Sequence, residues 1–277
     1  VFTTQPASAT SGIALVTQPV VTARNAAGAT DTDFVEVVTL TEASTGTLAN
    51  ATTSAVSGVA TFSGLAYTAS VDQEAFTLTA DDQSGVGTDL AATSTIAVTS
   101  DVVATKVIVY TNPTSTVSGV SMTQPVIRFV DAQNTLDAAD NTDVVTASVQ
   151  SGSGALSGTT TSTASNGVST FSGLIYSSTT DQSAFVLSFT DDAAGTNAFN
   201  GAPVDANSTL SNVVATKTIV YTNPTSTVSG VSMTQPVIRF VNAQNALDTA
   251  ANTDVVTAAV YSGGGALSGT TTSTASN

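Results

Sequence analysis

Residues 104–130 read ATKVIVYTNPTSTVSGVSMTQPVIRFV, and residues 215–241 read ATKTIVYTNPTSTVSGVSMTQPVIRFV. The two copies lie 111 residues apart, and the match continues through LSGTTTSTASN, which ends at Asn166 in one copy and at Asn277 in the other. A repeat of this length is as long as a whole domain, whereas the coils of a β-solenoid repeat every 20 to 30 residues or so. The sequence therefore favours tandem domains over a solenoid.

A more divergent first copy carries the same landmarks. Thr17-Gln18-Pro19 corresponds to Thr123-Gln124-Pro125, and the TFSGL run that begins at Thr61 recurs at Thr170. Asp81-Asp82 corresponds to Asp191-Asp192. We expect modules at residues 1–102 and 103–213, each of about 105 to 111 residues, followed by the N-terminal part of a third module at residues 214–277.

The residues within one module predict an all-β fold. Val, Thr, Ile, Phe and Tyr suit a pleated surface, and the strong helix formers are scarce. Short alternating runs are separated by Gly, Asn, Asp, Ser or Pro at the spacing typical of a sandwich. Seven strands in about 100 residues is the count of an immunoglobulin-like β-sandwich. In the first module we expect strands at Val1–Thr4, Leu15–Arg24, Phe34–Thr41, Thr47–Thr52, Val59–Tyr67, Ala75–Ala80 and Thr95–Thr99.

Alternation with a period of two predicts which side chains point into the core. The expected inner residues of the first module are Val38, Leu40, Phe76, Leu78, Ile96 and Val98. In the second module they are Val145, Ala147, Phe185, Leu187 and Phe189.

Composition and charge exclude several classes of function. The chain has 20 acidic and 5 basic residues, a formal net charge of -15, and no Cys, His or Trp. Disulfide scaffolds, Cys or His metal sites and histidine-dependent nucleophiles are thereby excluded, and the charge has the wrong sign for nucleic acid or an anionic membrane surface. No apolar run is long enough to cross a bilayer. The only Glu residues, Glu36, Glu42 and Glu74, lie in the first module, so we expect no repeated catalytic site and no enzyme.

Acidic residues gather in loops that the sandwich fold places at the pole where the chain enters each module. Carboxylates and carbonyls are the ligands of Ca²⁺, so calcium at the module junctions is one hypothesis, with a stiffening role. The alternative is that Asp and Asn cap turns, because no stretch has EF-hand spacing. In the third module Asn242 replaces Asp131 and Ala251 replaces Asp140. The candidate metal residues are Asp31, Asp33, Asp81, Asp82, Asp101, Asp131, Asp137, Asp140, Asp143, Asp191 and Asp192, with Asp89 in the same loops.

Other features have a structural and a chemical interpretation. Lys106 and Lys217 occupy matching positions at the start of a strand, where a covalent cross-link to Asn207 or Asn212 is one option and a solvated lysine the other. Asn50 and Asn207 begin glycosylation sequons, which arise by chance in a Thr-rich chain. The Thr and Ser residues of 159–165 predict an outward strand face rather than O-glycans. An ice-binding surface would need a flat threonine ladder at strand spacing, which a domain-length period does not supply.

The sequence resembles the tandem immunoglobulin-like repeats of large bacterial surface proteins, including adhesin stalks and extracellular fibres. The residues that carry the resemblance are VFTTQP at 1–6, TQPVVTARNAAG at 17–28 and SGVATFSGLAYT at 57–68. The resemblance covers essentially the whole chain and implies a spacer or polymer role. The chain lacks the cysteine pair and the tryptophan of antibody domains, so it does not imply antibody-like recognition.

We therefore expect a non-enzymatic structural protein, an extracellular surface fibre, stalk or layer that associates with its own copies. The alternatives are an adhesin that binds a glycan or host surface, and a passive spacer for a head domain elsewhere. Glycan binding requires exposed aromatic rings, and we expect most of the few aromatic residues in the core. The third module ends before its fifth strand, so we expect it to be completed by further chain or by a strand of another subunit.

Overall fold

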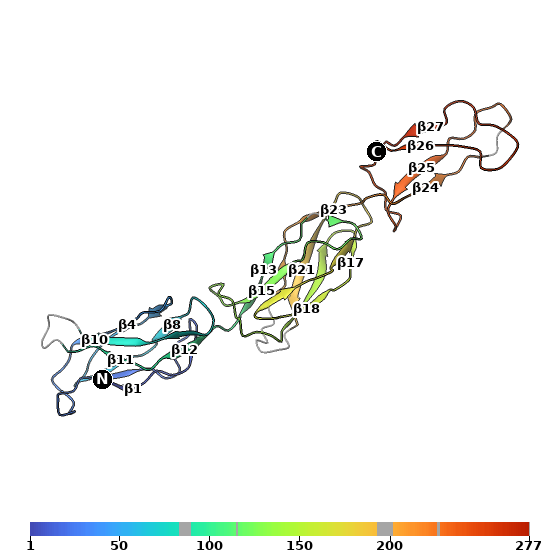
Figure 1. The fold of residues 1–277 in the computed structure, drawn as a ribbon. Coiled ribbons are helices and arrows are strands. Elements are labelled where there is room, and N and C mark those ends of the chain that lie inside the picture. Colours follow the sequence, from blue (N-terminus) through green and yellow to red (C-terminus); the bar gives the residue numbers. More distant parts are fainter. Residues whose placement is uncertain (83–89, 115, 193–201, 226–227, 277) are drawn as a thin grey trace.

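The structure is a computed structural model, and it describes residues 1–82, 90–114, 116–192, 202–225 and 228–276. These residues form strands β1 to β27 and no helix, so the all-β prediction is confirmed. Three modules follow one another along an extended line (Figure 1). No helix in the described ranges has the length and apolarity needed to cross a membrane.

The second module is a two-sheet sandwich. One sheet has the order β13-β15-β19, and the other has the order β14-β23-β21-β16-β18, with β22 also paired to β21. A separate pair, β17-β20, closes one side. β14 runs parallel to β23, and the other pairs of this module are antiparallel. The strands are β13 (Lys106–Thr111), β14 (Thr116–Val117), β15 (Val126–Val130), β16 (Val144–Ser151), β17 (Ala155–Ser157), β18 (Thr161–Thr163), β19 (Val168–Thr170), β20 (Ile175–Ser177), β21 (Ser183–Asp191), β22 (Val204–Asp205) and β23 (Thr209–Asn212).

The first module repeats this arrangement with shorter strands. Its sheets have the orders β1-β3-β7, β11-β10-β4-β6, β2-β12-β9 and β5-β8, and β2 runs parallel to β12. Both modules are immunoglobulin-like sandwiches in tandem. The strands are β1 (Phe2–Thr4), β2 (Ala9–Thr10), β3 (Val20–Thr22), β4 (Val37–Glu42), β5 (Thr47–Ala49), β6 (Thr52–Ser54), β7 (Val59–Thr61), β8 (Ala66–Thr68), β9 (Glu74–Phe76), β10 (Leu78–Asp82), β11 (Thr93–Ser94) and β12 (Val98–Asp101).

Several expected strands are shorter than the alternation suggested. The expected strand Leu15–Arg24 is reduced to β3, which begins after Pro19, a residue without a backbone N–H to donate to a ladder. The expected strands Thr47–Thr52 and Val59–Tyr67 each divide in two. The breaks coincide with Asn50 at φ 57° and Gly64 at φ 68°, values outside the strand region.

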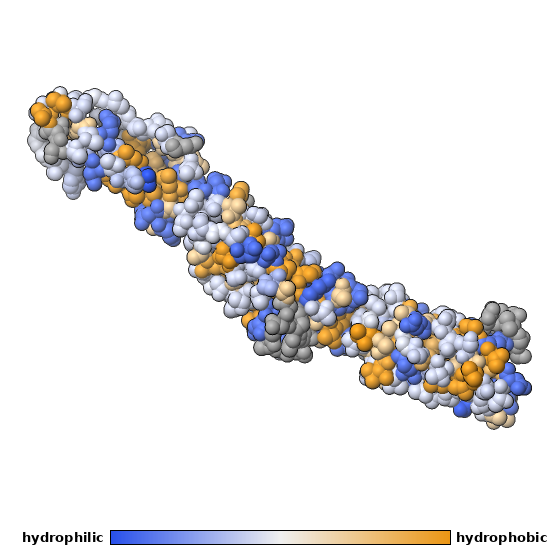
Figure 2. All heavy atoms as spheres, turned by 180° about the vertical axis from the view of Figure 1, so that it is seen from behind, coloured by the Kyte–Doolittle hydropathy of each residue, from blue (hydrophilic) through white to orange (hydrophobic). Residues whose placement is uncertain are grey.

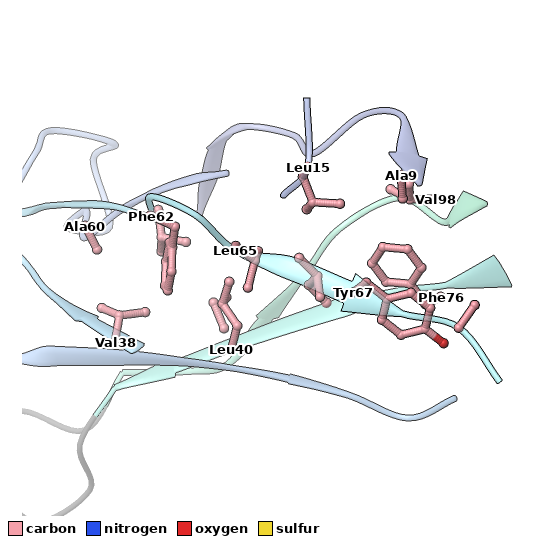
Figure 3. Close-up of a cluster of buried hydrophobic side chains, with 14 of the residues drawn as sticks. Ala9, Leu15, Val38, Leu40, Ala60, Phe62, Leu65, Tyr67, Phe76 and Val98 are labelled. Carbon is pink, nitrogen blue, oxygen red and sulfur yellow. The ribbon is translucent and has the colours of Figure 1, made fainter. Parts of the chain in front are cut away.

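Each complete module has its own apolar core between the sheets. The first core runs from Ala9 to Val102 and the second from Ala104 to Ala206. In the first core, Tyr67 stacks on Phe76 (Figure 3). The ring centroids are 3.9 Å apart. Tyr176 and Phe185 repeat this pair at 3.9 Å in the second core.

The expected inner residues are buried, with one exception. Val38, Leu40, Phe76, Leu78 and Val98 are buried, as are all five expected in the second module. The prediction for Ile96 was wrong, because its side chain is 66% exposed. Residues 95–97 lie between β11 and β12, outside any strand, so the period-two rule does not apply to them.

In each of the first two modules a tight hairpin connects the two sheets, at Val56–Val59 and at Ser165–Val168, and a neighbouring loop packs closely against it. In the second module Ser165 and Val168 exchange backbone hydrogen bonds around Asn166 at φ 51° and Gly167 at φ 72°. Positive φ at both central residues is the geometry that Asn-Gly favours. A Cβ on Gly167 would lie 2.1 Å from the carbonyl oxygen of Asp137, so only glycine allows the Asp137 loop to approach.

The third module contains β24 (Lys217–Thr222), β25 (Val237–Val241), β26 (Val255–Thr257) and β27 (Thr272–Thr274), paired as β24-β25 and β26-β27. Phe129 of the second module is fully buried, whereas its counterpart Phe240 is only half-buried. The local sequence is the same, so the difference comes from the opposing sheet and not from the strand itself.

This pair offers a test of where the core stability lies. We expect Phe129→Ala to lower the unfolding free energy of the second module by about 3–5 kcal/mol, because it removes a fully buried ring from a packed core. Phe240→Ala is the matched control and should cost about 1 kcal/mol or less in the same 277-residue chain. Denaturant unfolding monitored by hydrogen exchange in each module measures both. Equal losses would contradict the assignment of the core.

Candidate functional site: the junctions between modules

The junction between the second and third modules is built around one carboxylate. Asp181, in the loop between β20 and β21, accepts the backbone N–H of Val213 in the linker at 2.7 Å through Oδ1. Its Oδ2 accepts the N–H of Thr249 at 3.0 Å and the Thr249 hydroxyl at 2.7 Å, both from the third module. Asp181 thus joins its own module to the linker and to the next module at once.

The junction between the first and second modules has the same design. Asp72 accepts the N–H of Val102 in the linker at 2.8 Å and the N–H of Ala139 in the second module at 3.0 Å. From the other side, Asp137 accepts the linker N–H of Ala104 at 3.0 Å. At the second junction Asp248 accepts the N–H of Ala215 at 2.9 Å.

Two glutamines complete each junction. Gln73 donates its side-chain amide to Asp101, and at the second junction Gln182 donates to Asn212 at 2.6 Å. A second glutamine, from the next module, packs over a glycine: a Cβ on Gly12 would lie 3.8 Å from Gln133, and a Cβ on Gly119 would lie 3.5 Å from Gln244. The two junctions therefore repeat most of these contacts, although Asp72 accepts the N–H of Ala139 whereas Asp181 accepts that of Thr249, the counterpart of Ala138.

Burial and hydrogen bonds move the pKa values at the two junctions in opposite directions. Desolvation, with added repulsion from Asp72 and Asp137, raises the pKa of Asp101. At the second junction desolvation would raise the pKa of Asp181, but hydrogen bonds from the Thr249 hydroxyl and from backbone amides outweigh it and lower the pKa.

Glu74 shapes the loop that presents Asp72. Its carboxylate accepts the N–H of Ser70 at 2.8 Å, and both the N–H and the hydroxyl of Thr45 at 3.0 and 2.6 Å. Desolvation opposes these bonds, but together with the Tyr67 hydroxyl they lower the pKa of Glu74 to about 2. The carboxylate therefore stays charged and holds the loop closed across the neutral pH range.

The structure places Asp131 in a turn. Its Oδ1 accepts the N–H groups of Gln133 and Thr135 at 2.9 and 2.8 Å. Asn25 and Asn242 make the same pair of bonds in the other modules. Because a neutral amide serves as well as a carboxylate, the role common to the three positions is turn capping.

The other acidic residues of the second module lie at its entry pole, where the chain comes in from the first module. Asp140 accepts the N–H groups of Thr142 and Asp143 at 3.2 Å each. Asp143 and Asp191 are buried near the pole, with Asp191 opposite Val145 in the ladder, and Asp192 accepts the N–H of Val144 at 3.4 Å. These residues share one pole with Asp137.

Four other acidic residues of the first module, Asp31, Asp33, Asp81 and Asp82, lie away from the junction. Asp81 and Asp82 line a small cavity of about 40 Å³ with Val1 and Phe34. Asp31 accepts the N–H of Asp33 at 3.1 Å, and Asp33 is exposed. Within the described residues none of these four carboxylates bonds to the second module, so they do not belong to that junction. Asp89 lies outside the described residues.

The described residues do not form a calcium cage. Among them no group of three or more carboxylates is placed to hold a metal ion. Asp72 and Asp137 use both oxygens to accept backbone N–H groups. Asp131 Oδ2 and Asp140 Oδ2 are buried and accept no hydrogen bond from the described residues, which is the feature that favours a cation. Calcium binding therefore stays a prediction that the arrangement of the described carboxylates does not support.

The candidate cross-link is not assembled in the described residues. Lys106 donates to the carbonyl of Ala132 at 3.2 Å, and Lys217 repeats this bond to Ala243 at 3.2 Å. Asn212 instead accepts from Gln182, and the N–H of Asn207 donates to Asn112. Both lysines thus bind the turn that follows the adjacent strand.

Sequence reasoning missed Asp72 and Asp181, the central residues of the junctions. The signal was present, because Asp72-Gln73-Glu74-Ala75-Phe76 recurs as Asp181-Gln182-Ser183-Ala184-Phe185. In each copy the phenylalanine enters the core and the Asp-Gln pair faces the next module. This motif, an Asp-Gln pair followed after two intervening residues by a core phenylalanine, therefore marks the end of the module from which the chain leaves.

Exposed aromatic rings are more numerous than the sequence suggested. Of the five tyrosines, Tyr110 and Tyr221 are each 57% exposed, and Tyr261 is fully exposed. Arg128 lies 3.3 Å above the ring centroid of Tyr110, and Arg239 repeats this contact with Tyr221 at 3.3 Å. The Arg128 pair lies on the outer face of the sheet formed by β13 and β15, and the Arg239 pair lies at the equivalent place on β24 and β25 in the third module.

Comparison with known proteins adds little beyond the fold. No family model matches the chain, and no curated protein matches it. Among solved structures, it is similar to repeats EC22-24 of mouse cadherin-23, with 16% identity, 84% of this chain and 72% of that chain covered, and a TM-score of 0.29. It is also similar to the tandem Ig repeats of Dlar, with 11% identity, 76% and 94% covered, and a TM-score of 0.19.

A third similar structure is a Parabacteroides merdae β-glucuronidase, with 11% identity, 62% of this chain covered and a TM-score of 0.24. The chain matches only 21% of the length of that enzyme. TM-scores of this size carry no conclusion about activity or location.

The junction design predicts the effect of removing its carboxylate. We expect Asp181→Ala to speed hydrogen exchange at the amides of buried Val213 and of Thr249 about tenfold or more, because both N–H groups lose a charged acceptor. Asp205→Ala, which removes an exposed carboxylate of the same module, is the control. Exchange mapped by NMR or mass spectrometry would contradict the design if the two variants behaved alike.

Acid should reproduce this effect in the unaltered chain. The pKa of Asp181 is lowered when its carboxylate accepts the junction hydrogen bonds. The stability that Asp181 gives to the junction is therefore fully present above the ordinary pKa of 3.8, and it is lost as pH falls through the lowered pKa. Exchange at Val213 and Thr249 should therefore rise only below about pH 3.8 in the unaltered chain.

Proposed function

We propose that this chain is part of a non-enzymatic structural protein, a tandem array that forms an extracellular surface fibre, stalk or layer. The observation that carries the proposal is the repeated junction, in which Asp72 and Asp181 each bond to a linker amide and to the next module. Each module contacts its neighbours through one set of bonds, so length follows from copy number.

The surface and the composition agree with this role. On the face shown in Figure 2, polar and apolar side chains alternate along the chain and form no single large apolar face. The absence of Cys, the scarcity of Lys and the abundance of Ser and Thr support a location outside the cell. We propose further copies of the same protein as the partners.

Electron microscopy of the 277-residue chain tests the proposal. At about 1 M salt, which screens the junction carboxylates, we expect straight rods about three modules long, unchanged by chelator because these carboxylates bond to backbone amides, and lateral or end-to-end association at higher concentration. Antibody labelling of intact source cells should place the protein on the surface. Compact or randomly bent particles, or labelling only after lysis, would overturn the proposal.

A second candidate function is adhesion to a glycan, and the exposed Tyr110 and Tyr221 favour it. Aromatic rings with one open face are the groups on which sugars stack. Two such sites at equivalent places would add avidity.

A glycan array tests this candidate directly. We expect binding that falls at least about tenfold in Tyr110→Ala with Tyr221→Ala, as expected when two linked sites are lost together. The matched pair Tyr110→Phe with Tyr221→Phe keeps the rings and should bind. Absence of any ligand on the array, or equal binding by the alanine variant, would contradict it.

A further inference from the structure

The two junctions share most of their contacts but differ at several positions, among them Asp131 and Asn242, Asp140 and Ala251, and Glu74 and Ser183. Two further differences bear on the junction bonds themselves. Asp101 at the first junction corresponds to Asn212 at the second, and Ala138 corresponds to Thr249. Thr249 bonds across the second junction to Asp181 of the preceding module, whereas Asp101 and Asn212 each accept a glutamine side chain of their own module beside the junction. The repeat thus provides two versions of one joint within a single chain.

The first difference is a charge. Gln73 donates to Asp101 as Gln182 donates to Asn212, so the bond itself needs no charge at this position. Asp101 and Asp72 share the side-chain amide of Gln73, which lies 3.5 Å from Asp72, and Asp72 shares the N–H of Ala139 with Asp137, so the three carboxylates lie together. After desolvation, repulsion from Asp72 and Asp137 adds to the rise in the pKa of Asp101. Three like charges meet where the second junction has two carboxylates and an amide.

Most of the charged groups around these carboxylates make contacts of their own, and Arg128 lines a cavity together with Asp72. β12 lies between β2, which has no charged residue, and β9, where Glu74 pairs with Ser100 and binds Thr45 and Ser70. From the second module, Lys106 donates to the carbonyl of Ala132. Arg128 lies over the ring of Tyr110.

The second difference is a hydrogen bond. Thr249 donates both its N–H and its hydroxyl to Asp181, while the neighbouring N–H of Ala250 donates to Asp248 at 3.0 Å. At the first junction a single N–H, that of Ala139, is shared between Asp72 at 3.0 Å and Asp137 at 3.1 Å. Ala138 has no hydroxyl, so the first junction is held by fewer donors.

We propose that the first junction is a hinge that stiffens as salt screens its three carboxylates, and that the second junction, with one carboxylate fewer, is a stiffer joint that responds less to salt. Asp101 and Ala138 are the residues that make the first junction flexible, and Asn212 and Thr249 are the equivalent residues that make the second junction stiff. The inference rests on the junction contacts and not on the proposed fibre, so either one holds or fails separately.

The chain has no cysteine, which allows spin labels to be placed at chosen sites. Thr52, Thr161 and Thr272 are equivalent exposed residues of the three modules. Thr52→Cys with Thr161→Cys reports on the first junction, and Thr161→Cys with Thr272→Cys reports on the second. Pulsed dipolar spectroscopy of the full chain gives the distribution of distances across each junction.

At low salt, where screening extends over about 30 Å, we expect a broader distribution at the first junction than at the second. Raising the salt to about 1 M should narrow the distance distribution of the first junction more than that of the second. Asp101→Asn with Ala138→Thr should lower the open population of the first junction about fivefold and reduce its salt response to that of the second junction. The reciprocal pair, Asn212→Asp with Thr249→Ala, should broaden the second junction and increase its response to salt.

Each substitution introduces the residue that already stands at the equivalent position, so the modules keep their fold. The inference would be overturned if the distance distributions across the two junctions were equally broad at low salt, or if the paired substitutions left their widths unchanged. Calcium compared with sodium at equal ionic strength separates screening from specific binding. Narrowing by calcium alone would overturn the salt-screening hinge and support a metal site.

Discussion

Some backbone amides of the linker, and of the loop between β15 and β16 or between β25 and β26 in the next module, pair with no sheet. The structure depends on the acceptors that these amides find. A β-sandwich satisfies its own N–H groups in ladders, but the chain that leaves one sandwich for another has no ladder to join. Asp72 and Asp181 supply the acceptors, each for one linker amide and one amide of the following module. A carboxylate suits this role because it accepts several bonds at once.

Packing in the core and in the hairpins fixes the positions of these carboxylates and of the amides that they bind. Phe76 and Phe185 lie four residues after Asp72 and Asp181 and are locked by stacking on Tyr67 and Tyr176. On the receiving side, Gly167 lets the Asp137 loop approach the hairpin at a distance that no side chain would allow. The position of each junction therefore depends on buried packing in both modules.

The acidic character of the chain follows from the same arrangement. Many of its carboxylates accept backbone N–H groups in turns or at junctions, and few cations are present to pair with them. Asn25 and Asn242 show that an amide replaces a carboxylate where only a turn is needed. Asp101 lies near other carboxylates, so its negative charge affects how the two modules meet and not the geometry of a turn.

The sequence by itself determined the all-β class, the domain-length repeat and most of the core, because identical copies and period-two alternation are local patterns. Its errors were local too: Ile96 lies in a segment outside the strands, and Pro19 and Asn50 shorten strands that alternation alone would extend. Only the tertiary structure brought Asp72 to Ala139 and Asp181 to Thr249, across 67 and 68 residues. Such contacts depend on how two folded modules meet, and no periodicity within one module encodes that meeting.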